Sequence, residues 1–139
     1  MAIKKFSIDD DFEFSLIGIS SHSKDYRLCW SINKETGTQF EKKDDLKLEL
    51  QKSREMSLFS FYEYTDEENF NTQCIIANSG TSGMLLPEYK TLDYFWMIKG
   101  NFSGLMMREL IAKLGKIETI IACITIDVNT LKSKQNLIF

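Results

Sequence analysis

The sequence predicts an α+β fold, a two-layer sandwich in which two helices cover one face of a mainly antiparallel, six-stranded sheet. Two kinds of pattern predict it. Six segments alternate apolar and polar residues or are rich in β-branched and aromatic residues, whereas two others place apolar residues at helical spacing. These segments follow one another in the order β-α-β-β-β-β-α-β. Two helices over one apolar sheet face are the simplest arrangement for this order.

The first half of the chain predicts two strands and one helix. A strand is expected from Phe12 to Ile19, where alternation gives way to consecutive apolar residues, as in a strand that becomes buried on both faces. A helix is expected over 24–34, because Asp25 suits its first turn and Gly37 suits a C-terminal cap. Leucines alternate with charged residues over 46–50, which predicts a strand with one buried face.

The second half predicts four strands and one helix. Strands over 58–64 and 70–77 form a hairpin around an acidic loop. The remaining elements are a strand over 92–98, a helix over 101–114 that Asn101 can cap, and a strand over 117–126. The strands carry many aromatic residues. Because alternation sends some of them to the sheet face without helices, we expect a partner or ligand to cover that face.

The length of the chain predicts a single domain over 1–139, since a chain of this size buries roughly two thirds of its unfolded surface. Leu131 and the last three residues, Leu137 to Phe139, are apolar among polar neighbours. Burying each is worth roughly 1.5–3 kcal/mol, which predicts a tail at 128–139 that docks on the body or on a second subunit. The alternative is a recognition peptide whose terminal Phe139 is held by another protein.

Charge and cysteine content exclude several classes. The net charge is −3, and basic residues are scattered among acids, which disfavours nucleic acid as a ligand. No apolar run approaches the about 18 residues of a membrane helix, and three aspartates at 9–11 precede any signal-peptide core. Three separated cysteines and one histidine disfavour disulfides and zinc. We therefore expect a cytoplasmic protein without cofactor, metal, membrane or nucleic-acid partner.

The most informative segment runs from Leu86 to Tyr94 and reads LPEYKTLDY in one-letter code. It resembles the signature of the IPExxxVDY family of bacterial proteins, with Leu86 in place of the Ile and Leu92 in place of the Val. The segments 25–28 and 59–64 are also similar to that family. The resemblance implies a bacterial protein, and it implies no particular activity.

Two acids and a tyrosine of this motif can be interpreted in two ways. Glu88 and Asp93 are five residues apart across a turn, so we expect them to converge. As a functional group they would be a carboxylate pair for acid–base work or a cation, with Tyr94 as a further donor. As a structural group they would accept backbone N–H bonds, or pair with Arg27 or Arg108, while Tyr94 joins the core. The structural interpretation is favoured, because Asp before a strand commonly holds a turn.

Other candidate groups are weaker. His22 lies among serines at a strand-to-helix junction, where helix N–H groups can hold an anion, but a helix start rich in capping residues, with His22 partly exposed, is the favoured interpretation. The loop 78–83 has the glycines of a phosphate loop without its lysine, so we interpret it as a mobile connection. Cys29 is expected to be a buried, inert thiol. The candidate binding residues are thus Glu88, Asp93, Tyr94, His22 and Arg27, and none is assigned a catalytic role.

These observations favour a non-enzymatic, cytoplasmic binding or protein-interaction module. Its partner would be a protein or a small molecule, and it would form a homodimer through aromatic strand surface. The alternative is a small hydrolase or metal-dependent enzyme that uses Glu88, Asp93 and His22.

Overall fold

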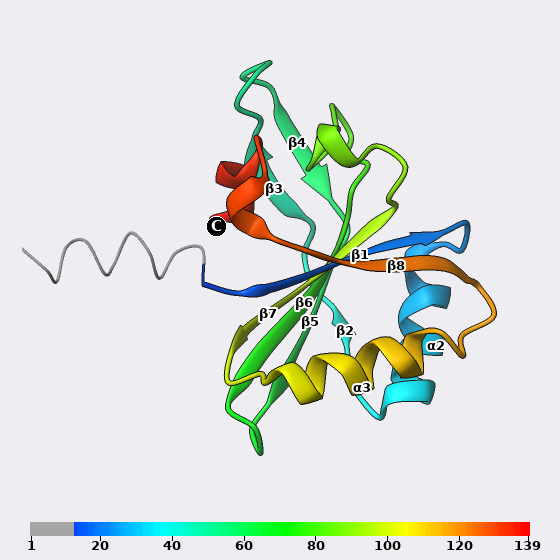
Figure 1. Ribbon diagram of the computed structural model, residues 1–139. Coiled ribbons are helices and arrows are strands. Elements are labelled where there is room, and N and C mark those ends of the chain that lie inside the picture. The colour runs from blue at the N-terminus through cyan, green and yellow to red at the C-terminus, as the bar shows by residue number, and fades with distance from the viewer. Residues whose placement is uncertain (1–12) are drawn as a thin grey trace, which may run out of the picture.

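The structure, a computed structural model, describes residues 13–139 (Figure 1). The expected strand start at Phe12 and the expectation of no signal peptide before it lie outside this range. The helices are α2 (Asp25–Thr36) and α3 (Gly104–Leu114). The main sheet contains β1 (Ser15–Ser21), β2 (Glu41–Lys42), β5 (Phe61–Asp66), β6 (Asn71–Ala77), β7 (Tyr94–Gly100) and β8 (Ile120–Ile126). Neighbours in the order β2-β5-β6-β7-β1-β8 are all antiparallel, so the predicted α+β class with two helices and a six-stranded antiparallel sheet is confirmed.

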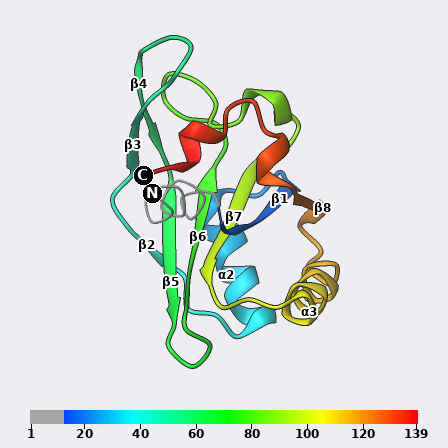
Figure 2. The ribbon, with the colours of Figure 1, turned by 60° about the vertical axis from the view of Figure 1, so that its left-hand side comes forward.

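Both helices begin and end close to where the sequence predicts. Gly37 ends α2 in the left-handed conformation at φ 74°, and its N–H donates to the carbonyl of Asn33. The cap of α3 is Ser103 instead of the expected Asn101, because Ser103 directly precedes the first turn and its Oγ accepts from the Met106 N–H at 3.2 Å. The two helices lie on one side of the sheet (Figure 2).

Beneath the helices lies one of two apolar cores. Leu28 and Ile32 of α2 and Leu114 of α3 are fully buried against the sheet. Trp96 of β7 is also fully buried there, with its ring edge-on to Phe40 at a centroid distance of 5.1 Å. Each large side chain buried in this way stabilises the fold by roughly 1.5–3 kcal/mol.

The second face of the sheet is also covered, and the chain itself supplies the cover. A separate hairpin, β3 (Leu46–Glu49) with β4 (Met56–Phe59), packs there together with the loop 78–92 and the tail. The expected strand over 46–50 therefore pairs in this hairpin instead of the main sheet, and the run 58–64 divides at Ser60 between β4 and β5. Leu50 and Phe59 explain the placement, because both are buried against the second face. The sequence predicts a partner or ligand over the aromatic residues of this face, but the hairpin, loop and tail of the same chain cover them instead.

The segment 128–139 lies against the same face. It forms two short 3-10 helices, η2 (Val128–Thr130) and η3 (Lys134–Leu137). Leu131 and Leu137 are buried, and the Asn136 amide donates to the carbonyl of Leu85 at 2.8 Å. The rings of Phe139 and Phe61 meet edge-on at 6.0 Å. Among residues 13–139, no helix is both long and apolar enough to cross a membrane.

Candidate functional site

The motif 86–94 begins with two buried anchors. Pro87 starts a short 3-10 helix, η1 (Pro87–Tyr89), and leaves Leu86 extended at φ −123° and ψ 90°, as a residue before proline prefers. Leu86 is fully buried. Leu92 lies directly over Gly18 of β1, where a Cβ atom would overlap its side chain. The apolar positions of the motif therefore fix the loop to the second core.

A single buried amide, Asn78, holds this loop from inside. Its Nδ2 donates to the carbonyls of Tyr89 and Leu92 at 3.0 and 2.9 Å, and its Oδ1 accepts from the Leu86 N–H at 2.8 Å. Its side chain has no exposed area. Asn78 thus satisfies three backbone groups that the turn would otherwise leave unpaired in the core. The sequence pattern did not identify it, because it looks like the first residue of a polar loop.

Asp93 and Tyr94 fasten the motif to the start of α2. The Oδ2 atom of Asp93 accepts from the Ser21 N–H at 2.8 Å, and its own N–H donates to the carbonyl of Ile19. The Tyr94 hydroxyl donates to the carbonyl of Ser23 at 2.7 Å, while its ring is buried. Both side chains therefore fix the turn that leads from β1 into α2.

Glu88 faces the tail instead. Its Oε2 accepts from the Ser133 N–H at 2.8 Å. Partial burial acts to raise the pKa of Glu88, but the hydrogen bonds from Ser133 and neighbouring backbone outweigh this effect and lower it below the usual value. Glu88 and Asp93 line different hollows, so the expected convergence of the two carboxylates does not occur. The motif is not built as a carboxylate pair.

The hollow that contains Asp93 has a volume of about 450 Å³ and opens beside the start of α2. His22, Asp25, Ser60 and Tyr94 also line it. The Ser60 hydroxyl donates to Asp25 Oδ2. Asp25 is half-buried and therefore belongs to a polar cluster that local pattern cannot reveal, since Ser60 lies 35 residues away.

Burial raises the pKa of two groups near Asp25, Tyr94 and Cys29. Burial first, and then the carboxylates of Asp25 and Asp93, raise the pKa of Tyr94 to about 12. Burial, with a further contribution from Asp25, raises the pKa of Cys29 to about 12 against an opposing effect of Lys42. At neutral pH Cys29 is thus a thiol and not a nucleophilic thiolate, as expected for an inert buried cysteine.

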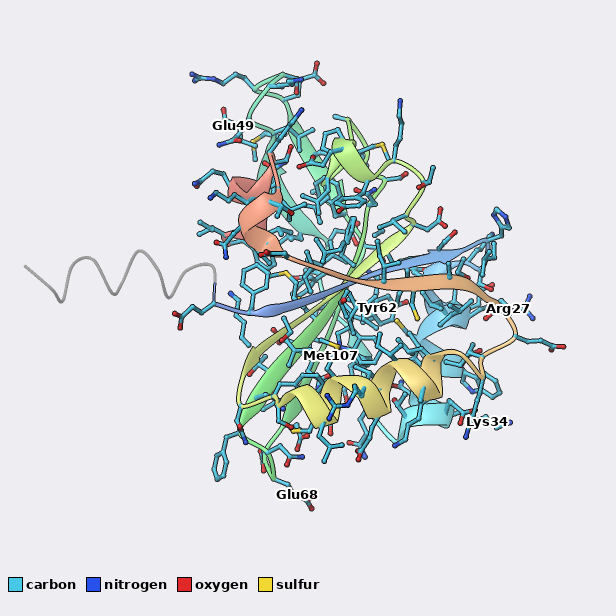
Figure 3. The ribbon with its side chains drawn as sticks, viewed as in Figure 1. Arg27, Lys34, Glu49, Tyr62, Glu68 and Met107 are labelled. Carbon is cyan, nitrogen blue, oxygen red and sulfur yellow. The ribbon has the colours of Figure 1, made fainter. Side chains whose placement is uncertain are left out.

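His22 and Arg27 lie at the surface beside a second, larger hollow of about 630 Å³. It lies between the first turn of α2 and the start of β8, and Tyr26 and Ile121 also line it. Figure 3 shows Arg27 at the outer edge of the molecule. The structure thus brings His22 close to both Asp93 and Arg27, but it places Glu88 elsewhere.

Backbone N–H groups of the loop 78–83 donate hydrogen bonds to acceptors within the protein. The N–H groups of Gly80, Thr81 and Ser82 donate to the Gly83 carbonyl, the Leu58 carbonyl and the Ser57 hydroxyl. These donors point at protein acceptors and not at a ligand. In the part of the chain that the structure describes, no group of three His, Cys, Asp or Glu side chains is placed to hold a metal ion.

Comparison of this chain with family models, curated proteins and solved structures found no match.

We expect Asp93→Ala to lower the free energy of unfolding by about 1–3 kcal/mol, because it leaves the Ser21 N–H without its acceptor. Asp93→Asn should cost less, since an amide oxygen can still accept. Urea unfolding of both variants measures the difference. Asp44→Ala, at an exposed position, is the matched control. Equal stability of the wild type and Asp93→Ala would show that Asp93 does not hold the turn.

Proposed function

We propose that this protein is a non-enzymatic interaction module that binds another protein with the outer face of α2. A single observation carries the proposal: Tyr26 and Trp30 are 60% and 64% exposed on this face, one helical turn apart. Arg27 lies beside them, next to the hollow of about 630 Å³. We define Tyr26, Arg27 and Trp30 as the α2 surface.

The residue types of the α2 surface are those that dominate protein-binding energies. Tryptophan, tyrosine and arginine are enriched among hot-spot residues because they combine a large apolar area with a polar group. Among the ring contacts found within residues 13–139, Trp30 takes part in one. The ammonium of Lys34 lies above its ring, 5.0 Å from the ring centroid. A partner that covers Trp30 would remove this large ring from water at little cost in side-chain entropy. The adjacent hollow offers room for a side chain of the partner.

The enzymatic alternative has less support. A hydrolase or metal enzyme built on Glu88, Asp93 and His22 needs these side chains around one substrate. Glu88 and Asp93 instead accept backbone N–H bonds in separate hollows. The two carboxylates are therefore used by the fold.

The setting of this function is also a proposal. The resemblance of residues 86–94 supports a bacterial protein of the IPExxxVDY family. The three cysteines are unpaired in the structure, and a cytoplasmic location keeps such thiols reduced. We therefore propose that the module works in the bacterial cytoplasm.

Trp30→Ala should lower the capture of the partner by about tenfold or more, because truncation of a central aromatic residue commonly costs this much. The full chain would be immobilised, exposed to native cell extract, and the captured proteins quantified by mass spectrometry. The unfolding free energy should change by less than about 0.5 kcal/mol, since the side chain is exposed.

Phe70→Ala is the matched control, because Phe70 is 80% exposed at the turn between β5 and β6, away from α2. It should capture the same proteins as the wild type. If Trp30→Ala and Phe70→Ala capture equal amounts, the α2 surface is not the binding face.

A further inference from the structure

The two edges of the main sheet differ in how they are protected. One edge is β2, which has only two residues, Glu41 and Lys42, both charged. Short, charged edge strands prevent pairing with other chains. The other edge is β8, which has seven residues and neither a charge nor a proline. Ile121 and Ile124 are 61% and 41% exposed on it. Among the described residues, no strand pairs with the outer edge of β8.

Helix α3 lies at the same edge of the molecule as β8 (Figure 2). The two elements are in contact and run in opposite directions (Figure 1). On its outer side α3 exposes a stripe at positions i, i+3, i+4 and i+7, which we call the α3 stripe: Leu105, Arg108, Glu109 and Ala112. The ion pairs found within residues 13–139 include neither Arg108 nor Glu109.

The α3 stripe is complementary to itself. If the same helix from a second copy packs against it in antiparallel orientation, Arg108 lies opposite Glu109 of the second copy. The reverse pair forms at the same time. Leu105 then lies opposite Ala112 of the second copy. A two-fold axis therefore produces two ion pairs and two apolar contacts from one set of residues.

A single two-fold axis can relate both the β8 strands and the α3 helices of two copies. At 1.5 Å per helical residue, the centre of the α3 stripe is about 8 Å from the C-terminal end of α3. At roughly 3.3 Å per strand residue, Cys123 in the middle of β8 is about 10 Å from the start of the strand. Since the chain turns back between the two elements, these centres lie at similar heights. Antiparallel pairing of two β8 strands around Cys123 is thus compatible with packing of the two α3 helices.

We propose that a second copy of this chain covers the β8 edge, so that two sheets join into one across a two-fold axis and the α3 stripes pack together. The inference rests on the proposed function in treating the chain as an interaction module, but it assigns a different surface, which meets the hollow beside α2 at Ile121, and a defined partner. It also replaces the aromatic strand surface as the route to a homodimer, because that surface is covered within the chain.

Sedimentation equilibrium on the full chain, from low to high micromolar concentration, tests the proposal. The wild type is expected to dimerise. Arg108→Glu and Glu109→Arg should each weaken the dimer by about tenfold, since each places like charges opposite one another. The double variant R108E/E109R should restore the dissociation constant to within about threefold, because both pairs form again with reversed sign. Ile124→Lys should also weaken the dimer by about tenfold, since it charges the edge.

Two further variants separate this surface from others. Glu49→Arg, on the hairpin at the far end of the molecule (Figure 3), should dimerise as the wild type does. Trp30→Ala should also leave the dimer unchanged, so loss of partner capture and loss of dimer are independent results. A wild type that stays monomeric at all concentrations overturns the proposal. The β8 edge would then be free to pair with a strand of another protein. A dimer that Arg108→Glu or Ile124→Lys does not weaken overturns it as well.

Discussion

Asn78→Ala is expected to lower the free energy of unfolding by about 3–5 kcal/mol. The change leaves the Leu86 N–H and the carbonyls of Tyr89 and Leu92 without the side-chain partner that each has in the wild type. An unsatisfied buried group costs about 1–3 kcal/mol, and the Tyr89 carbonyl keeps one bond from the Leu92 N–H. Because small domains are stable by only about 5–15 kcal/mol, the variant should be close to unfolding at physiological temperature. Urea unfolding followed by tryptophan fluorescence measures the loss.

Asn69→Ala is the matched control for this prediction. Asn69 is exposed, and its side chain bonds only Asp66 among the described residues. Its replacement should change the unfolding free energy by less than about 0.5 kcal/mol. If Asn78→Ala is as stable as Asn69→Ala, the loop 86–92 is held by its apolar anchors alone.

Removal of residues 137–139 is expected to lower the free energy of unfolding by about 3 kcal/mol. Leu137 is fully buried in the second core, and loss of a buried leucine side chain costs about 2–5 kcal/mol. The truncation also removes the contact between the rings of Phe139 and Phe61. The melting temperature should fall by about 10 °C. Differential scanning calorimetry on the truncated and complete chains measures it.

A shorter truncation separates docking from recognition. Removal of Ile138 and Phe139 alone keeps Leu137, and both removed residues are more than a third exposed. It should therefore cost only about 1 kcal/mol. If the truncation at 137 leaves the melting temperature unchanged and abolishes the capture of a partner, the tail is a recognition peptide and not part of the core.

The elements that local pattern predicts well are those that tertiary contacts do not rearrange. Helix α2 is fixed by its apolar face and by Gly37, both of which are visible in the sequence. The strand over 46–50 has a correct alternation, but its place in a separate hairpin depends on Leu50 and Phe59 meeting the second sheet face. Hydrophobic periodicity and residue propensity do not predict this packing, because they describe one segment at a time.

The same distinction applies to the candidate site. Asp93 could be predicted to hold a turn, because aspartate before a strand is a local signal. Its acceptor role toward Ser21 joins residues 72 positions apart, and the bond from Ser60 to Asp25 joins residues 35 apart. The role of Asn78 could not be predicted for the same reason. The carbonyls that accept from its amide come close to it only when the loop is folded.

The central claim is that the motif 86–94 serves the fold, while the α2 surface serves binding. Partner capture by Asp93→Asn tests it most directly, because this variant removes the charge and any general base but keeps an acceptor for the Ser21 N–H. We predict that Asp93→Asn captures the same proteins as the wild type, whereas Trp30→Ala does not. A folded Asp93→Asn variant that has lost its partner, beside a Trp30→Ala variant that has kept it, would contradict the account.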